Sequence, residues 1–442
     1  MTRKSYFILS LGLALATAVL AQSPAASPVK WSGGEMDSGD WPQWRGPVRD
    51  GVSTEKNLLD RWPEGGPPLA WKAEGLGRGL AAAVVLKGRF YIVGDHDQQS
   101  FLQCYDFATQ KQIWSCKIGK AWAGGEGASP AIDGDALFGQ TNVGDNYCVS
   151  LDGKLRWVNN CYSDFKGFLM NPQYGFPQTP LVDGKNVIVN PGGPEDCVVA
   201  LNRDTGKPNW SISAAVIKDA MKSDKPRGSD RAAYSSAVVT EGGGQRHYVD
   251  LVGKGLIGFR PSDGKILWAY NLAAGEANIP TPIVRGDYVY CCSSYGSGTV
   301  LLKLSPTTDE GVKSEQVYHL DLNNLEGQSV LVGDYTYTGE GGYSGNPVCV
   351  EFLTGKIMWK GKQKGAGIAR VTSADGKIIF RAESGEISLI DANPREFNMI
   401  SWFKPDDGAK GGEPHWSHPV VSHGLLLIRQ HDSLFAFDLR KK

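Results

Sequence analysis

The chain carries a repeating pattern of short apolar runs separated by polar turns. One unit consists of an aliphatic strand end, a turn that often contains Gly-Lys, and then an aromatic residue, as in Ala200–Trp210 and Val350–Trp359. Asp-Gly or Thr-Gly in the turn supplies the positive φ angle that a tight β-hairpin requires. The pattern therefore predicts a β-hairpin at each copy of this unit.

The closing aromatic residue of the unit recurs at intervals of 41 to 58 residues. Its copies are Trp71, Trp114, Trp157, Trp210, Trp268, Tyr318, Trp359 and Trp402. A repeat of this length is typical of a propeller or a solenoid. We predict that each ring docks on the neighbouring repeat, where its burial contributes about 4–6 kcal/mol before entropy is counted.

A second hairpin precedes the first in each period, as in Ser129-Pro-Ala-Ile-Asp-Gly. Two hairpins make four strands, which is one propeller blade. The last repeat has three strands, ending at Leu434–Phe437, whereas Pro68–Trp71 has no blade of its own. We predict an all-β fold, an eight-bladed β-propeller of four-stranded antiparallel blades closed by pairing of the N- and C-terminal strands. A solenoid would instead need polar caps at both ends.

Three segments follow from this pattern. Residues 1–21 have the features of a signal peptide, because Arg3 and Lys4 precede the apolar run Ile8–Leu20 and small residues follow it. That run is shorter than the ~20 residues of a membrane-spanning helix. We expect residues 22–66 to form an N-terminal arm and residues 67–442 the propeller, at 47 residues per blade. The product is predicted to be periplasmic or secreted, without a membrane span.

The composition agrees with a turn-rich globular protein. Glycine (56) and proline (24) are abundant, and 13 Trp, 16 Tyr and 15 Phe supply a core. The 47 acidic and 46 basic residues give a net charge of -1, so nucleic acid is not an expected partner. We expect a monomer.

The eight cysteines contain no C-x-x-C motif, which argues against a zinc knuckle or a thioredoxin-type site. The adjacent pair Cys291 and Cys292 is interpreted as one buried and one exposed thiol on opposite faces of a strand. The longest interval between aromatic copies contains Ser213–Lys222, a predicted short helix. This helix is interpreted either as a lid or as a surface insertion.

The hairpin Ala200–Trp210 resembles the tryptophan-docking motif Ala-x-Asp-x-x-Thr-Gly-x-x-x-Trp of the quinoprotein-dehydrogenase-like propellers, which are built from PQQ-like repeats. The resemblance covers nearly all of residues 67–442. It implies this fold, but it leaves the activity open, because the family includes calcium-dependent dehydrogenases that hold pyrroloquinoline quinone (PQQ) and also non-catalytic propellers of the BamB type. The segment Asp40–Gly51 is similar to the N-terminal segment of exported PQQ-like repeat proteins that have no assigned reaction.

The resemblance implies that functional residues precede the innermost strand of each blade, around one mouth of the central channel. Equivalent positions are Leu80, Glu126, Phe176, Ala233, Asn278, Glu326, Ile368 and His415. The candidate ligand-binding residues are Arg78, Trp122, Glu126, Tyr174, Arg231, Asn278, Glu326, Arg370, His415 and Trp416. If calcium is bound, Glu126, Asn278 and Glu326 would share it, with Arg231 or Arg370 facing an anionic group. The alternative is that these polar groups bond to main-chain groups at strand ends or to channel water.

Three functions remain open at this stage. The one we favour is a non-catalytic binding or scaffolding platform whose channel mouth takes a protein or small-molecule ligand. The second is a PQQ-dependent dehydrogenase that uses PQQ and calcium. The third is glycan recognition through Trp122, Tyr174 and Trp416. A two-histidine metal site at His415 and His418 is not expected, because residues three apart in an extended stretch point to opposite faces.

Overall fold

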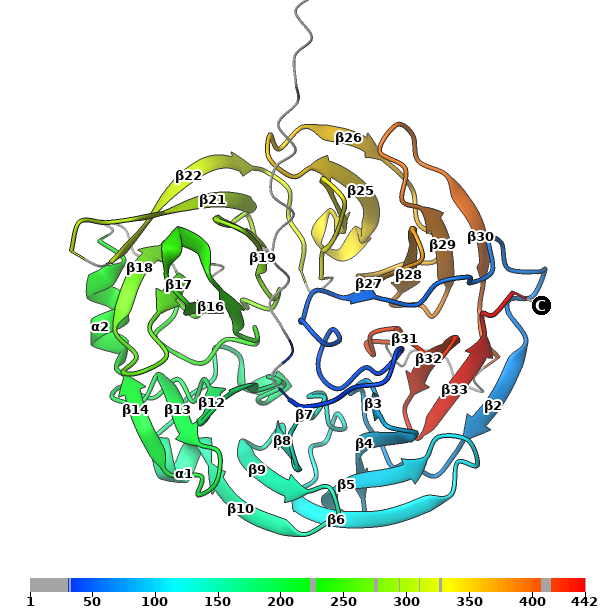
Figure 1. The fold of residues 1–442 in the computed structure, drawn as a ribbon, viewed down its shortest axis with the longest axis horizontal. Coiled ribbons are helices and arrows are strands. Elements are labelled where there is room, and N and C mark those ends of the chain that lie inside the picture. The colour runs from blue at the N-terminus through cyan, green and yellow to red at the C-terminus, as the bar shows by residue number, and fades with distance from the viewer. Residues whose placement is uncertain are drawn as a thin grey trace, which may run out of the picture.

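The computed structural model describes residues 31, 33–222, 228–273, 277–293, 295–309, 311–325, 328–406 and 415–441. The predicted signal peptide and Glu326 lie outside these residues. Within them, the chain forms eight antiparallel sheets arranged around a central axis (Figure 1). The predicted all-β, eight-bladed propeller is confirmed.

The first four blades follow one another along the chain. Blade 1 contains β3 (Val84–Leu86), β4 (Arg89–His96), β5 (Gln99–Asp106) and β6 (Gln112–Lys120). Blade 2 contains β7 (Ala131–Asp133), β8 (Ala136–Gln140), β9 (Asp145–Ser150) and β10 (Leu155–Asn160). Blade 3 contains β11 (Leu181–Asp183), β12 (Asn186–Val189), β13 (Val198–Asn202) and β14 (Pro208–Ile212). Blade 4 contains β15 (Val238–Thr240), β16 (His247–Val252), β17 (Gly255–Phe259) and β18 (Ile266–Tyr270).

The remaining blades repeat this order, and blade 7 gains a strand from the arm. Blade 5 contains β19 (Ile283–Arg285), β20 (Tyr288–Cys292), β21 (Thr299–Pro306) and β22 (Val312–Leu320). Blade 6 contains β23 (Val330–Val332), β24 (Tyr335–Glu340), β25 (Asn346–Glu351) and β26 (Ile357–Lys360). Blade 7 contains β27 (Ala369–Ala374), β28 (Lys377–Ala382), β29 (Ile387–Asp391) and β30 (Met399–Phe403), with β1 (Val52–Ser53) added in parallel beside β27. Blade 8 contains β31 (Val420–Ser422), β32 (Leu425–Gln430), β33 (Ser433–Asp438) and β2 (Leu69–Ala73).

Blade 8 closes the ring by joining the two ends of the propeller. Strand β2 pairs antiparallel with β33, and Trp71 lies opposite Ala436. This is the predicted pairing of Pro68–Trp71 with Leu434–Phe437. Because both termini share one sheet, no blade is left with an open edge at the closure.

The helices are short and lie between strands. They are α1 (Cys161–Phe165), η1 (Pro172–Tyr174), α2 (Ala214–Ala220), η2 (Gly242–Gly244) and η3 (Gly342–Ser344). The predicted helix within Ser213–Lys222 is α2, and the Ser213 side chain caps its N-terminus by accepting a hydrogen bond from Val216 N. In the described residues, no helix is long and apolar enough to cross a membrane.

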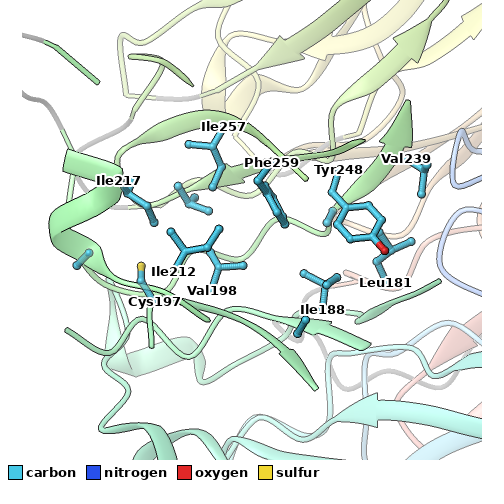
Figure 2. Close-up of a cluster of buried hydrophobic side chains, with 14 of the residues drawn as sticks. Leu181, Ile188, Cys197, Val198, Ile212, Ile217, Val239, Tyr248, Ile257 and Phe259 are labelled. Carbon is cyan, nitrogen blue, oxygen red and sulfur yellow. The ribbon is translucent and has the colours of Figure 1, made fainter. Parts of the chain in front are cut away.

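The apolar cores lie between neighbouring blades. Figure 2 shows one of them, in which Val198 of blade 3 faces Ile257 and Phe259 of blade 4. Ile217 of α2 extends this core at its outer end. The helix is therefore packed on the blade 3–blade 4 interface, which agrees with a surface insertion.

Most of the periodic aromatic side chains cross from the outermost strand of one blade to the next blade. Their polar atoms donate to main-chain carbonyls there: Trp114 to Leu151 (3.0 Å), Trp157 to Arg203 (2.8 Å), Trp210 to Pro261 (2.9 Å), Tyr318 to Phe352 (2.9 Å) and Trp359 to Asn393 (2.7 Å). Each of these bonds ties a blade to the outer hairpin of its neighbour. The buried polar tip of the ring is thereby satisfied.

The glycine of the receiving hairpin is part of this contact. A Cβ atom on Gly206 would lie 2.7 Å from the Trp157 ring, and one on Gly264 would lie 2.6 Å from the Trp210 ring. Both glycines also have positive φ angles, 71° and 72°. The Thr-Gly and Asp-Gly turns therefore serve two purposes, since glycine allows the turn and leaves room for the neighbouring ring.

Two of the aromatic residues make different contacts. Trp268 Nε1 bonds to His247 Nε2 of its own blade at 2.9 Å. Trp71 packs against Phe90 and Phe107 of blade 1, with ring centroids 5.8 Å and 5.6 Å away.

The prediction that Trp402 docks on the next blade is wrong, because the docking position of blade 7 lies one residue earlier in the chain. In blade 1, Trp114 pairs with Cys104 directly beside a β-bulge. The equivalent residue of blade 7 is Ser401, which pairs with Leu389 beside the corresponding bulge. A shift of one residue reverses the face of a strand, so Trp402 points the other way and is 46% exposed.

All eight cysteines are buried and unpaired with one another. Cys291 packs in the core between blades 4 and 5, and Cys292 Sγ lies 3.4 Å from Ser329 Oγ. The interpretation that one thiol of this pair is exposed is wrong, because both faces of β20 are covered, one by blade 4 and the other by the segment before β23 of blade 6.

Candidate functional site

The arm crosses one end of the central channel (Figure 1, blue). Trp41 exchanges two main-chain hydrogen bonds of 2.8 Å with Val85 of β3. Farther along the arm, Arg49 Nη2 donates to Thr179 O of the segment before β11 (2.9 Å), and β1 pairs with the end of β27. Because these contacts reach blades on different sides of the axis, the arm closes this end of the channel.

Two buried arginines anchor the arm. Arg45 Nη2 donates to the Asp50 carbonyl (2.7 Å), and Arg49 Nη1 donates to Gln43 Oε1 (3.0 Å). Burial lowers the pKa of Arg45 to about 10 and that of Arg49 to about 9, which keeps both protonated at neutral pH. The arm therefore brings two positive charges into the interior.

The other end of the channel opens into a cavity of about 450 Å³. Trp44 of the arm lines the closed side, where its Nε1 donates to Thr281 Oγ1 (3.1 Å). Tyr174 and Tyr343 line the open side and are exposed. The volume falls within the roughly 300–1,000 Å³ that is usual for small-molecule sites. In the part of the chain that the structure describes, the arm thus forms the floor of this cavity, and exposed tyrosines lie at its mouth.

Half of the ten candidate site residues line this cavity. They are Arg78, Trp122, Tyr174, Arg370 and Trp416. Of the other mouth positions, Leu80 and Ile368 also line it, whereas Phe176 and Ala233 are buried away from it.

Trp416 is held in a fixed orientation. Its Nε1 donates to Glu383 Oε1 (2.7 Å), and Glu383 Oε2 accepts from Ile368 N (3.1 Å). Arg370 Nε donates to the carbonyl of Trp416 (3.1 Å), with the guanidinium 6.0 Å from the indole centroid. The carboxylate of Glu383 therefore positions Trp416, because both of its oxygens accept hydrogen bonds from the protein.

Tyr174 meets aromatic side chains from two directions. Its ring centroid lies 6.4 Å from that of Tyr234, at 86°, and 6.2 Å from that of Trp416, at 63°. Asn142 Nδ2 donates to Tyr174 O (2.9 Å) and fixes the loop that carries it. Residues that are distant in the chain thus share one wall of the cavity.

Glu126 is fully buried and lies behind this wall. Its Oε2 accepts from Asn142 N (2.8 Å), and its Oε1 lies 2.8 Å from Ser100 Oγ. Ser100 Oγ is also 2.6 Å from Asp95 Oδ1, and one hydroxyl proton cannot serve both carboxylates. Burial, together with the charge of Asp95, raises the pKa of Glu126 to about 8. Glu126 is therefore a neutral acid at pH 7 that supports the Asn142 loop.

Asn278 is also fully buried and bonds within the protein. Its Nδ2 donates to the carbonyls of Val252 (2.9 Å) and Gly253 (3.3 Å), and its Oδ1 accepts from Ser293 Oγ (3.1 Å). The two bonds from Nδ2 go to main-chain carbonyls at the end of β16, as in the alternative interpretation of the mouth positions.

The remaining candidates do not line the cavity. Arg231 is exposed on the surface outside it. His415 is buried, and its main-chain N and its Nδ1 both lie 3.0 Å from Glu383 O, so it supports the loop that carries Trp416. Glu326 lies outside the described residues.

Several lining residues were not predicted from the sequence. They include Trp44, Gln328, Tyr343, Glu383 and His418. Trp44 and Glu383 lie outside the pre-strand positions that the repeat singles out, since one is in the arm and the other follows β28. Tyr343 has a usable signal, because it is an aromatic residue in the glycine-rich run Gly341-Gly-Tyr-Ser-Gly345, where a core position is not expected.

The calcium shell that the resemblance implies is not assembled by its described candidates. Glu126 and Asn278, the two described candidates for the cation, direct their oxygens at protein donors and do not line the cavity. In the part of the chain that the structure describes, no three His, Cys, Asp or Glu side chains come together as a metal site. Calcium prefers six to eight oxygen ligands.

The eight blades, the docking aromatic residues and the aromatic-lined mouth define a β-propeller of the PQQ-like repeat class. A family model described as "Outer membrane protein assembly factor BamB" matches residues 98–360, which is more than half of the chain. The chain belongs to this family. A comparison with curated protein sequences gave no match.

Solved structures share the fold at low sequence identity. BamB from Moraxella catarrhalis superimposes with a TM-score of 0.60 at 14% identity, covering 85% of this chain and 98% of that one. A europium-containing methanol dehydrogenase gives 0.60 at 11% identity, covering 89% and 90%. A quinohemoprotein alcohol dehydrogenase from Pseudomonas putida HK5 gives 0.56 at 12% identity, covering 91% and 80%. Because these neighbours include BamB and two dehydrogenases, the likeness shows the fold alone.

Proposed function

We propose that this protein is a non-catalytic binding platform that takes a ligand or a partner segment into the cavity at its channel mouth. One observation carries the proposal. The cavity is closed behind by Trp44 and lined by fixed aromatic side chains, while the predicted acidic ligand Glu126 is turned into the protein. A site of this kind offers aromatic and polar binding surfaces, and the described candidates for a calcium ion do not point into it.

The family and the sequence support the same proposal. The family description names an assembly factor, which is a binding role. The features of residues 1–21 favour export, so we place the protein in the periplasm or outside the cell. We propose that it acts as a monomer, since closure of the ring satisfies the strands of blade 8 within one chain.

The test has an enzymatic arm and a binding arm. Purified protein is incubated with PQQ and calcium, desalted and assayed for quinone absorbance and for dye-linked alcohol oxidation. We expect neither. In the binding arm, a panel of saccharides, peptides and organic acids is screened by thermal shift. A ligand that raises the melting temperature of the parent protein should not raise that of Trp416→Ala. It should still raise the melting temperature of Trp402→Ala, a matched variant outside the cavity.

Two results would contradict the proposal. Retained quinone with alcohol oxidation that Trp416→Ala abolishes would assign the cavity to a dehydrogenase. Ligands whose thermal shift survives Trp416→Ala would place binding elsewhere on the molecule.

A further inference from the structure

The aromatic side chains of the cavity are arranged for a ligand with separate apolar faces. Tyr174 stands nearly perpendicular to Tyr234 (86°) and is steeply inclined to Trp416 (63°). A flat aromatic ligand is best held between parallel rings, which these two pairs do not provide. A pyranose ring suits single aromatic faces, because its axial C–H groups form an apolar patch while its hydroxyls lie at the rim.

The closed side of the cavity carries hydrogen-bonding groups that the protein leaves open. Gln328, 1% exposed, accepts from Thr281 N (2.6 Å) at Oε1, and its Nε2 makes no hydrogen bond within the described residues. Ser236 Oγ accepts from Thr179 N (3.2 Å) and keeps its own proton to donate. The His418 ring packs edge to face on Trp44, with ring centroids 4.6 Å apart, and its ring nitrogens make no hydrogen bond to a described residue. Buried polar groups need partners, and a ligand with many hydroxyls supplies them.

The charges of the cavity favour an anion. Among the described residues, Arg78 and Arg370 line it together with one acidic side chain, that of Glu383. Both oxygens of Glu383 already accept from Trp416 Nε1 and Ile368 N. These neutral donors hold the carboxylate in place without removing its charge, and two guanidinium groups against one carboxylate leave the described lining with an excess of positive charge.

The closed side is also electropositive. Burial, together with the charges of Arg370, Arg45 and Arg381, holds the pKa of His418 well below its usual range. His418 is therefore neutral, so that it offers one donor and one acceptor. A negative group placed there meets attraction from the same arginines that keep the histidine from gaining a proton.

From these contacts we infer that the cavity binds a saccharide that carries a carboxylate, as in a uronic-acid-containing oligosaccharide, with the carboxylate near Arg370 and a sugar face on Trp416. This inference rests on the proposed function, since it names the ligand class of the same cavity. Arginine is suited to the role because its planar donors match a carboxylate.

The experiment compares three probes with the same purified protein by titration calorimetry. The probes are trigalacturonic acid, its methyl ester and cellotriose. We expect the acid to bind at least tenfold more tightly than the ester, and the advantage to shrink as salt is raised. Arg370→Gln should remove the advantage and leave binding of the ester nearly unchanged. Trp416→Ala should weaken the acid and the ester alike, by at least tenfold.

Matched controls lie outside the cavity. Arg395→Gln removes an exposed arginine and Trp402→Ala an exposed tryptophan, and both should bind trigalacturonic acid as the parent protein does. Equal binding of acid and ester, or absence of binding by the acid, would overturn the inference. If a neutral sugar or a peptide then bound and Trp416→Ala abolished that binding, the proposed function as a binding platform would remain supported, and only the inference about an acidic saccharide would be wrong. If the protein retained PQQ and oxidised alcohols, both the proposed function and this inference would be wrong.

Discussion

Trp62 of the arm donates its main-chain N–H to Ser401 Oγ of blade 7 at 3.1 Å. Its indole is 3% exposed and packs edge to face on Phe403, with centroids 5.3 Å apart. Ser401 holds the position that carries a docking aromatic residue in other blades. The arm therefore supplies from outside the repeat the ring that blade 7 lacks, in the core it shares with blade 8.

Trp62→Ala should lower the free energy of unfolding by about 3–5 kcal/mol, because it empties a large site in a packed core. Trp402→Ala should cost about 1 kcal/mol or less, since Trp402 is half exposed and has Lys364 Nζ 5.1 Å from its ring centroid. Urea unfolding of both variants measures the difference. Equal losses would mean that Trp62 does not replace the docking residue.

Gly206→Ala should destabilise the protein more than Gly184→Ala. Both glycines have positive φ angles, 71° and 58°, so both substitutions carry a backbone strain of about 1–2 kcal/mol. A Cβ on Gly206 also meets the Trp157 ring at 2.7 Å, whereas one on Gly184 meets nothing within 4 Å. We expect a further loss of about 1–3 kcal/mol for Gly206→Ala. Similar melting temperatures for the two variants would show that the ring does not press on this turn.

The thiols should be unreactive until the protein unfolds. All eight are buried, and burial raises the pKa of Cys161 and Cys197 to about 12 and that of Cys292 to about 11. Without a reductant, Ellman's reagent should find no thiol in the native protein and eight in 8 M urea. Six in urea would reveal a disulfide, and reaction in buffer would reveal an exposed thiol.

The fold was predictable because its signals are local. Each hairpin carries its own turn glycine and its own aromatic residue, so counting copies such as Trp114 and Trp359 gave the eight blades and left Pro68–Trp71 to pair with the C-terminal strand. Trp402 shows the limit of such counting. Its spacing from Trp359 is correct, but one residue decides which face of a strand a side chain occupies, and the bulge that sets it is not visible in the sequence.

The site was predictable in part for a related reason. The repeat identifies which positions precede the innermost strands, and Arg78, Tyr174 and Trp416 do line the cavity there. It does not say which way a polar side chain turns, and Glu126 turns inward because Ser100 and Asn142 offer it partners. No spacing rule places residues of a non-repeating segment in the channel. For this reason Trp44 was missed.

The last prediction concerns the buried Glu126, whose pKa of about 8 lies above the 4.5 of an exposed glutamate. Between these two values the unfolded chain loses a proton that the folded protein keeps, so the free energy of unfolding should fall as pH rises, by about 1.4 kcal/mol per pH unit. Glu126→Gln has no proton to release there, and its amide still meets Ser100 and Asn142. Urea titrations measure the free energy of unfolding of both proteins. Between pH 5 and 8, the value for Glu126→Gln should rise relative to that of the parent protein by this amount per pH unit, and above pH 8 the difference should level off. Asp250, with a pKa raised to about 6 by burial, titrates alike in both proteins and cancels in the difference. Parallel curves would mean that Glu126 is ionised in the folded protein and that the mouth is built around a charge.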